Sequence, residues 1–96
     1  MVKQASKRDC IVYSIQNCAY CAATKRYLEK FNIAFEEIVV DALPEPESTQ
    51  VASYIKELTG ALVFPVIVAG ETFTCGFKKK DLQNLLGFKD PRPSFL

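Results

Sequence analysis

Two cysteines, Cys18 and Cys21, stand three positions apart between an apolar run and a segment with helical spacing. A thiol at the start of a helix meets unpaired backbone N–H groups and the positive end of the helix dipole, and both favour the thiolate. Thiols of Cys-x-x-Cys pairs in this setting ionise with pKa values of about 3.5–7.5, against about 8.5 for free cysteine, and the thiolate is the nucleophile. Cys21 lies about one helical turn from Cys18, so it can attack a mixed disulfide formed there. The spacing therefore predicts a dithiol that cycles through exchange with a partner's disulfide.

Two other interpretations of the cysteine pair are weaker. A structural zinc site needs four ligands, yet the sequence has no histidine, and Cys10 and Cys75 do not form a second Cys-x-x-Cys. Two buried cysteines without a role are the simpler alternative, but a Cys-x-x-Cys between a strand and a helix is typical of thioredoxin-like redox motifs. We therefore predict two catalytic cysteines and no metal ligand.

The elements that must position this pair follow from the hydrophobic pattern. Runs of β-branched and aromatic residues predict strands, and apolar residues at three- and four-residue spacing predict helices. Ser48 is a candidate N-cap, Gly60 and Gly87 are expected helix ends, and Gly70 and Glu71 make a tight hairpin turn. The predicted elements are strand 10–15, helix 19–31, strand 34–40, helix 48–59, strand 64–69, strand 72–74 and helix 81–86.

These elements predict one α/β domain over residues 1–96, with a core of about 9–88 and short exposed tails. The first strand–helix–strand unit should be a right-handed crossover, which makes its two strands parallel. The hairpin then completes a four-stranded mixed sheet, β-α-β-α-β-β-α in chain order, with helices on both faces. Because ligands of such sheets bind outside the carboxyl ends of the parallel strands, Cys18 is expected at the reactive edge.

The charge is nearly balanced, with 12 basic and 11 acidic residues, so no broad patch that attracts nucleic acid or an anionic membrane is expected. The basic cluster Lys78-Lys79-Lys80 is more typical of a solvated face. No run approaches the roughly 20 apolar residues of a membrane-spanning helix, and a reactive cysteine pair is typical of the cytosol. We therefore expect a cytoplasmic monomer with no nucleic-acid or membrane partner.

Four segments stand in an order that carries a family resemblance. They are Tyr13-Ser14, Cys18-Ala19-Tyr20-Cys21, Phe64-Pro65-Val66 and the stretch from Gly70 to Cys75-Gly76-Phe77. Together they resemble the glutaredoxin family, which has the thioredoxin fold, over about residues 9–88. The resemblance implies a thiol–disulfide oxidoreductase in which Cys18 is the nucleophile, Cys21 the resolving thiol and Pro65 a cis-proline beside them.

The resemblance points to two branches of that family. Glutathione-using members usually carry a lysine shortly before the first cysteine, a Thr-Val-Pro triplet and a Gly-Gly-x-Asp stretch, and here those places hold Ile15, Val63-Phe64-Pro65 and Thr74-Cys75-Gly76-Phe77. The stretch from Gly76 to Lys78 is instead similar to NrdH-type redoxins, which are reduced by thioredoxin reductase and donate electrons to ribonucleotide reductase. Tyr20, in contrast, is more typical of glutathione-dependent members.

The reductant therefore stays open between thioredoxin reductase and glutathione, with no tightly bound cofactor, and the substrate is a protein disulfide or a glutathione mixed disulfide. Glutathione needs cations for its carboxylates, and the sequence offers Lys25, Arg26 and Lys78 but no charge in the loop before Cys18, so weak binding is expected. The residues expected to contact a substrate are Tyr20, Phe64, Pro65, Gly76, Phe77 and Lys78.

Two further functions are compatible with the resemblance. Some glutaredoxins carry an iron–sulfur cluster held by one cysteine from each of two subunits and by glutathione, but Cys21 and Tyr20 argue against that role here. A non-catalytic adaptor is the other alternative, because folds are reused for docking. Cys10 is expected to be a small core residue. Cys75 is expected to be an inert thiol, with a regulatory disulfide or a glutathione adduct as the alternative.

Overall fold

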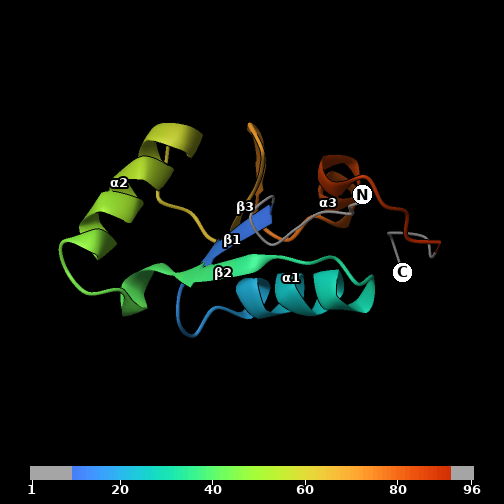
Figure 1. Cartoon of the computed structure of the whole chain (residues 1–96), viewed down its shortest axis with the longest axis horizontal. Helices are drawn as coiled ribbons and strands as arrows, with labels where there is room; N and C mark the ends of the chain where they lie inside the picture. The colour runs from blue at the N-terminus through green and yellow to red at the C-terminus, as the bar shows by residue number, and fades with distance from the viewer. Residues whose placement is uncertain (1–9, 92–96) are drawn as a thin grey trace.

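The computed structural model describes residues 10–91 (Figure 1). These residues form four strands and three α-helices in the predicted order, with a 3₁₀ turn, η2, between β2 and α2. The elements are β1 (Cys10–Ser14), α1 (Ala19–Lys30), β2 (Glu36–Val39), η2 (Val40–Ala42), α2 (Glu47–Thr59), β3 (Val66–Ala69), β4 (Thr72–Cys75) and α3 (Lys79–Leu86). Residues 1–9 and 92–96, which include most of the predicted tails, lie outside the described residues.

The four strands form one mixed sheet in the order β2-β1-β3-β4. β1 pairs with β2 in parallel, as the crossover rule predicted, and β3 pairs antiparallel with both β1 and β4. Tyr13 near the end of β1 lies opposite Ile38 of β2 and Val66 of β3. The carboxyl end of β1, from which the chain passes to the cysteine pair, is therefore enclosed by strands on both sides.

Alternating residues of the central strands face two different hydrophobic clusters. Val12 and Ile67 pack with Tyr27 and Leu28 of α1 and with Leu82 of α3. On the other face, residues of β1 and β3 pack against α2 in a cluster of Tyr13, Val40, Ile55 and Val66. Each fully buried aliphatic side chain contributes about 1.5–3 kcal/mol from burial. The helices thus cover both faces of the sheet, as expected, with α1 and α3 on one face and α2 on the other.

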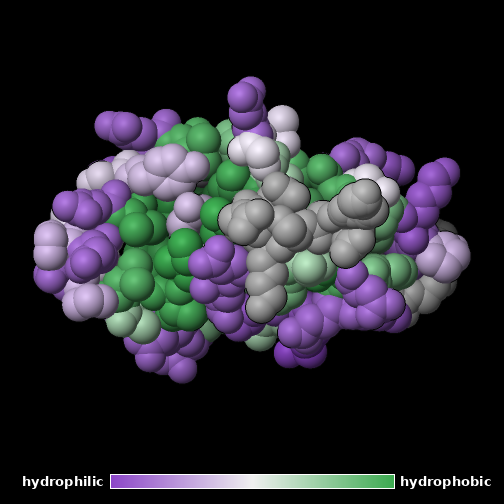
Figure 2. Space-filling view, in the orientation of Figure 1, coloured by the Kyte–Doolittle hydropathy of each residue, from purple (hydrophilic) through white to green (hydrophobic). Residues whose placement is uncertain are grey.

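Figure 2 shows where the second cluster approaches the surface, because hydrophobic residues gather along the inner side of α2 and the segment that joins it to β2. Hydrophilic residues cover the outer side of α2 and much of α1 in the same view. Among the described residues, no helix combines the length and the apolar composition that crossing a bilayer requires.

The two glycines predicted to end helices do so in the left-handed conformation. Gly60 follows α2 with φ of 89°, and Gly87 follows α3 with φ of 73°. Each donates its N–H to a carbonyl four residues earlier, Lys56 and Gln83 respectively, at 2.8 Å. Glycine suits these positions because it has no Cβ to oppose a positive φ.

The predicted N-cap of α2, Ser48, is wrong. The helix begins one residue earlier, at Glu47, after Pro46 at the cap position, and Ser48 instead donates its hydroxyl to the Val40 carbonyl at 2.9 Å. The Glu45 carboxylate accepts the Thr49 N–H at 3.2 Å. Proline restricts φ and has no N–H to satisfy, so the helix starts directly after Pro46, and the Glu45 carboxylate rather than the Ser48 hydroxyl accepts an N–H of the first turn.

Other element ends differ by a few residues from the prediction. β2 and β3 are shorter than expected, and α3 begins at Lys79 rather than at Asp81. Lys79 lies over the Tyr27 ring, with Nζ 5.6 Å from the ring centroid. One member of the predicted solvated lysine cluster therefore opens a helix and covers an aromatic ring.

Candidate active site

Cys18 and Cys21 are joined by a disulfide, with 5.2 Å between their Cα atoms. Cys18 is the N-cap of α1, with extended backbone angles of φ −119° and ψ 107°. Its Sγ accepts the Cys21 N–H at 3.1 Å, and its carbonyl accepts the Ala22 N–H at 3.1 Å. The sulfur therefore lies against the N–H groups of the first turn, where an anion is stabilised.

The two sulfur-bearing residues differ in exposure. Cys18 is half-buried, whereas Cys21 is 2% exposed, and the Tyr20 side chain between them is 68% exposed. A partner approaching the helix end meets Cys18 and Tyr20 before Cys21. The geometry thus gives Cys18 the accessible position and Cys21 the enclosed one.

A short loop, residues 15–17, carries the chain from β1 to Cys18. Its Gln16 N–H donates to the Asp41 carboxylate at 3.0 Å, which ties the loop to η2. Asn17 has φ of 57°, a left-handed conformation that asparagine adopts more readily than most residues. These two features turn the chain sharply enough for α1 to begin at Ala19.

Pro65 and Gly76 lie at the same edge of the sheet as the cysteine pair. Val66 is opposite Tyr13 and Cys75, so Pro65 comes beside the end of β1 and Gly76 follows the end of β4. The Gly76 N–H donates to the Pro65 carbonyl at 2.8 Å, and the Phe64–Pro65 peptide bond is cis. Pro65 is buried and Phe64 is half-buried against the α2 cluster.

Phe77 and Lys78 follow at the start of α3 and point to different environments. The Phe77 ring packs on the Tyr27 ring, with centroids 5.6 Å apart and planes at 73°. Lys78 is exposed at the N-cap position of α3. The Phe77 side chain belongs to the core between α1 and α3, and the substrate contacts expected of these two residues stay predictions.

A groove of about 690 Å³ opens beside the disulfide on the side of β2. Across it, Lys25 Nζ of α1 lies 2.7 Å from Oε2 of Glu37 in β2. The buried Ser14 hydroxyl donates to the same oxygen at 2.7 Å. The groove is lined by Ile15, Gln16, Asn17, Cys18, Ala19, Cys21, Ala22, Lys25, Glu37 and Val39.

The sequence did not single out Glu37 or Ser14 as site residues. Lys25 was expected to supply a cation for glutathione, and its ammonium group is engaged by Glu37. The sequence did contain one indication of Glu37. Phe35, Glu37 and Val39 alternate along the strand, so the charged side chain lies on the same face of the sheet as two apolar ones. A carboxylate on that face of a strand beside the first helix requires a partner.

The ionisable groups near the site respond to their surroundings in different ways. Partial burial raises the pKa of Glu37, but hydrogen bonds from Lys25 and Ser14 together with the Lys25 charge outweigh it, so the pKa lies below its ordinary value. Burial raises the pKa of Cys75, and the Lys78 charge offsets part of that rise. Burial also raises the pKa of Cys10 to about 11. Cys10 is fully enclosed in the core, whereas Cys75 is half-buried against the α2 cluster.

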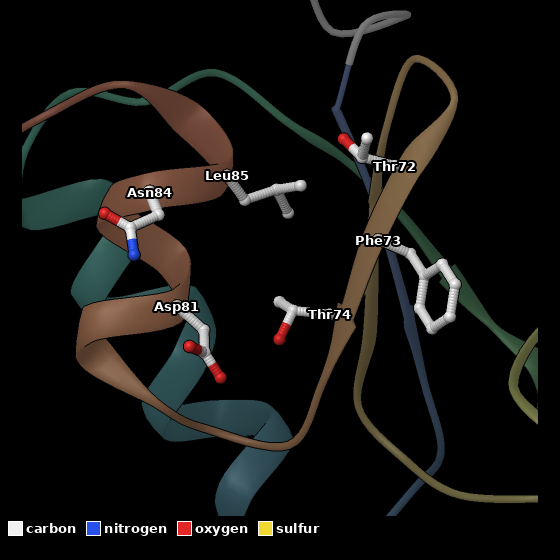
Figure 3. Close-up of a pocket in the computed structure, with 6 residues that line it drawn as sticks. All are labelled: Thr72, Phe73, Thr74, Asp81, Asn84 and Leu85. Atoms are coloured by element: carbon white, nitrogen blue, oxygen red, sulfur yellow. The ribbon is translucent and has the colours of Figure 1, made fainter.

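A separate hollow of about 410 Å³ lies between β4 and α3 (Figure 3). In this view, Asp81 and Thr74 extend toward each other from the helix and the strand. The hollow is lined by Thr72, Phe73, Thr74, Asp81, Asn84 and Leu85. None of the predicted site residues lines it, so the cysteine pair and its groove form the candidate active site.

Within residues 10–91, no three or more histidine, cysteine or acidic side chains cluster closely enough to hold a metal ion. The site as described therefore consists of two cysteines, the surrounding backbone and the charged groups of the groove.

Comparisons with known proteins agree with this geometry. The glutaredoxin family model matches residues 10–74. The glutaredoxin-like protein NrdH of Salmonella typhimurium is 32% identical over 74 residues, which cover 77% of this chain and 84% of that protein. The structure of the glutaredoxin from Methanosarcina mazei Go1 is similar with a TM-score of 0.80 and 26% identity, over 91% of this chain and 85% of the other. The NrdH-redoxin of Escherichia coli is 31% identical with a TM-score of 0.63, over 88% of this chain and 97% of the other.

The matched segment runs from the first residue of β1 into β4 and includes both cysteines, Tyr20 and Pro65. The sheet order, the helix opened by Cys18 and the similarity to solved glutaredoxins identify the thioredoxin fold, and the similarity to NrdH proteins agrees with the motif at Gly76. The chain belongs to the glutaredoxin family and is a thiol–disulfide oxidoreductase.

Proposed function

We propose that this oxidoreductase reduces disulfides of protein partners in the cytoplasm, as a monomer, with Cys18 as nucleophile and Cys21 as resolving thiol. Thioredoxin reductase then reduces the Cys18–Cys21 disulfide. Ribonucleotide reductase is the partner that the similarity to NrdH-type redoxins suggests for the first assay.

The observation that carries the proposal is the position of the Cys18 sulfur at the N-terminus of α1. Its Sγ accepts the Cys21 N–H at 3.1 Å, and such a donor stabilises a thiolate more than a thiol. The half-buried Cys18 is also the more exposed of the two cysteines. Acidity and access therefore both favour Cys18 as the group that attacks first.

The chemistry proceeds in two exchange steps. The Cys18 thiolate attacks one sulfur of the partner's disulfide, forming a mixed disulfide and releasing the partner's other sulfur as a thiolate. Cys21 then loses its proton and attacks Cys18 Sγ, which forms the Cys18–Cys21 disulfide and releases the partner's second sulfur. The partner gains two electrons and the protein loses two. The 5.2 Å between the Cα atoms of the two cysteines is within the range that a disulfide requires.

Three observations favour a reductase over glutathione as electron donor. Lys25, the cation that lines the groove together with Cys18, is engaged by Glu37 at 2.7 Å. The Phe77 ring packs on Tyr27 in the core. Glutathione-using members carry a polar anchor at the corresponding place in the sequence. In addition, the solved NrdH-redoxin of Escherichia coli, itself a glutaredoxin-like protein, has a thioredoxin-like activity profile.

The deciding experiment measures NADPH oxidation with insulin as the disulfide substrate, and then with oxidised ribonucleotide reductase. Thioredoxin reductase is expected to support turnover well above that given by glutathione with glutathione reductase. Cys18→Ser should abolish turnover, and Cys21→Ser should accumulate a mixed disulfide visible by mass spectrometry. Equal or faster turnover with glutathione would overturn the assigned reductant, and an active Cys18→Ser variant would overturn the assigned nucleophile.

A further inference from the structure

The enclosed position of Cys21 raises the question of where its proton goes. Cys21 is 2% exposed, and a thiol surrounded by protein ionises less readily than one in water because its thiolate loses hydration. The second exchange step nevertheless needs the Cys21 thiolate. A proton acceptor in the same groove would remove this obstacle.

Glu37 is the one carboxylate among the residues that line this groove in the described part of the chain. It lies opposite Val12 in the β1–β2 register, and Val12 packs with α1 residues. Glu37 is therefore on the face of the sheet that α1 covers. Its neighbour Glu36 lies opposite Ile11, which packs in the α2 cluster on the other face.

Two hydrogen bonds hold the Glu37 carboxylate at this place. Lys25 of α1 and Ser14 of β1 both donate to Oε2 at 2.7 Å, which leaves Oε1 without either of these two donors. Lys25 is four residues after Cys21, so both side chains lie on the same side of α1, about one turn apart. Lys25 thus holds the carboxylate on the side of α1 that carries Cys21, and Cys21 and Glu37 both line the groove.

The charged side chains that line hollows together with Glu37 all belong to helix α1. Lys25 contacts it directly, and Arg26 and Glu29 of α1 line an adjoining hollow of about 340 Å³ together with Glu37. Ser14 is uncharged and buried. The surroundings therefore keep Glu37 ionised near neutral pH, the state in which it can accept a proton.

We infer that Glu37 is the proton acceptor for Cys21 in the resolving step, an inference that rests on the proposed role of Cys21. The Cys21 thiol gives its proton to the Glu37 carboxylate directly or through one water, the reach that proton transfer requires. The sulfur electron pair then forms the Cys18–Cys21 bond, the bond between Cys18 and the partner sulfur breaks, and the partner leaves as a thiolate. Glu37 returns the proton to solvent. The step is an exchange and needs no further oxidant or reductant.

A stopped-flow reaction with excess DTNB separates the two steps. The reduced protein releases a first TNB when Cys18 attacks, at a rate proportional to DTNB, and a second when Cys21 attacks, at a rate independent of DTNB. All variants carry Cys75→Ala so that the half-buried thiol does not contribute. Glu37→Gln keeps the shape of the side chain and an oxygen for Ser14.

Glu37→Gln is expected to slow the second phase by about tenfold and to change the first by less than about twofold. This is less than the 10²–10⁴-fold typical of general bases, because a carboxylate held by Lys25 is a weak base. Glu36→Gln, on the opposite face, should leave both phases unchanged. Lys25→Met should not slow the second phase, because the freed carboxylate is more basic.

The outcomes separate this inference from the proposed function. Release of a single TNB by the parent protein would mean that Cys21 does not resolve, and both proposals would fall. A normal second phase in Glu37→Gln would overturn the role of Glu37 alone. Equal slowing in Lys25→Met and Glu37→Gln would assign the pair a structural role and would also overturn the inference.

Discussion

The backbone N–H of Cys21 donates to the Sγ of Cys18 at 3.1 Å, so one sulfur both caps helix α1 and forms the redox-active bond. Serine, threonine, aspartate and asparagine normally occupy an N-cap because their oxygen accepts such an N–H. A thiolate can do the same with a full negative charge. Stabilisation of the Cys18 thiolate, the proposed nucleophile, and of the first helical turn therefore depends on the same contact.

This shared contact predicts that Cys18→Ala and Cys18→Ser, which are both expected to be inactive, differ in stability. The serine oxygen can still accept the Cys21 N–H, whereas alanine leaves that N–H without its cap. Cys18→Ala should therefore unfold with a free energy about 1 kcal/mol lower than Cys18→Ser. Urea denaturation of both variants under reducing conditions measures the difference. Equal midpoints would show that the cap adds no stability.

Substitution of Gly76 is expected to lower both stability and activity, whereas substitution of a glycine away from the site should lower stability alone. Its φ of 78° is left-handed, and a Cβ there would meet only the Lys78 side chain at 3.9 Å, so Gly76→Ala costs backbone strain of about 1–2 kcal/mol. Gly70 in the hairpin turn has φ of 62° and open space around it, so Gly70→Ala is a matched control.

Both glycine variants should lose similar unfolding free energy, but only Gly76→Ala should slow insulin reduction, because Gly76 donates to Pro65 at the edge that carries the cysteines. Thermal melts and the NADPH assay measure the two quantities. A similar loss of activity in Gly70→Ala would attribute the effect to stability rather than to the site.

The cysteine pair could be located from the sequence because its signals are local. The signals are the run of β-branched and aromatic residues before Cys18, the helical spacing after it and the glycines at 60 and 87. All act within a few neighbouring residues, and the structure confirms each of them. The parallel pairing of the first two strands also followed from the general handedness of crossovers. Local chemistry therefore determined where the sulfurs lie.

The Glu37 network could not be located in this way, because it depends on strand register. Ser14 and Glu37 are 23 residues apart, and Lys25 and Glu37 are 12 apart. Phe77 was equally ambiguous, since an aromatic residue after Gly76 fits either a substrate surface or a core, and only the position of α3 against Tyr27 decides. Ser48 failed as an N-cap because Pro46 starts the helix earlier.

Burial of Cys10 is expected to make the free energy of unfolding fall at alkaline pH. Its pKa is raised from 9.0 to about 11 by burial, so between these values the unfolded chain releases a proton that the folded protein retains. The free energy of unfolding should therefore fall with rising pH by up to about 1.4 kcal/mol per unit from this group. Cys10→Ala should show a shallower decline between pH 9 and 11 in urea titrations under reducing conditions. Parallel curves would mean that Cys10 ionises equally in both states.

The Glu37 carboxylate is expected to stabilise the folded protein at neutral pH and to lose this effect as the pH falls. Its pKa in the folded protein is below the ordinary 4.5, so the folded state binds its proton less readily than the unfolded chain. The stabilisation is complete above pH 4.5 and disappears as the pH falls through the folded pKa.

The Lys25–Glu37 pair is partly exposed, with 31% and 28% of the two side chains accessible. Its contribution to stability is therefore expected at about 1 kcal/mol or less. Urea denaturation at pH 6 and pH 3 should show a smaller difference in stability between the parent protein and Glu37→Gln at pH 3 than at pH 6. Added salt at pH 6 should reduce the difference as it screens the charges, whereas a difference of the same size at both pH values would assign the effect to packing rather than to charge.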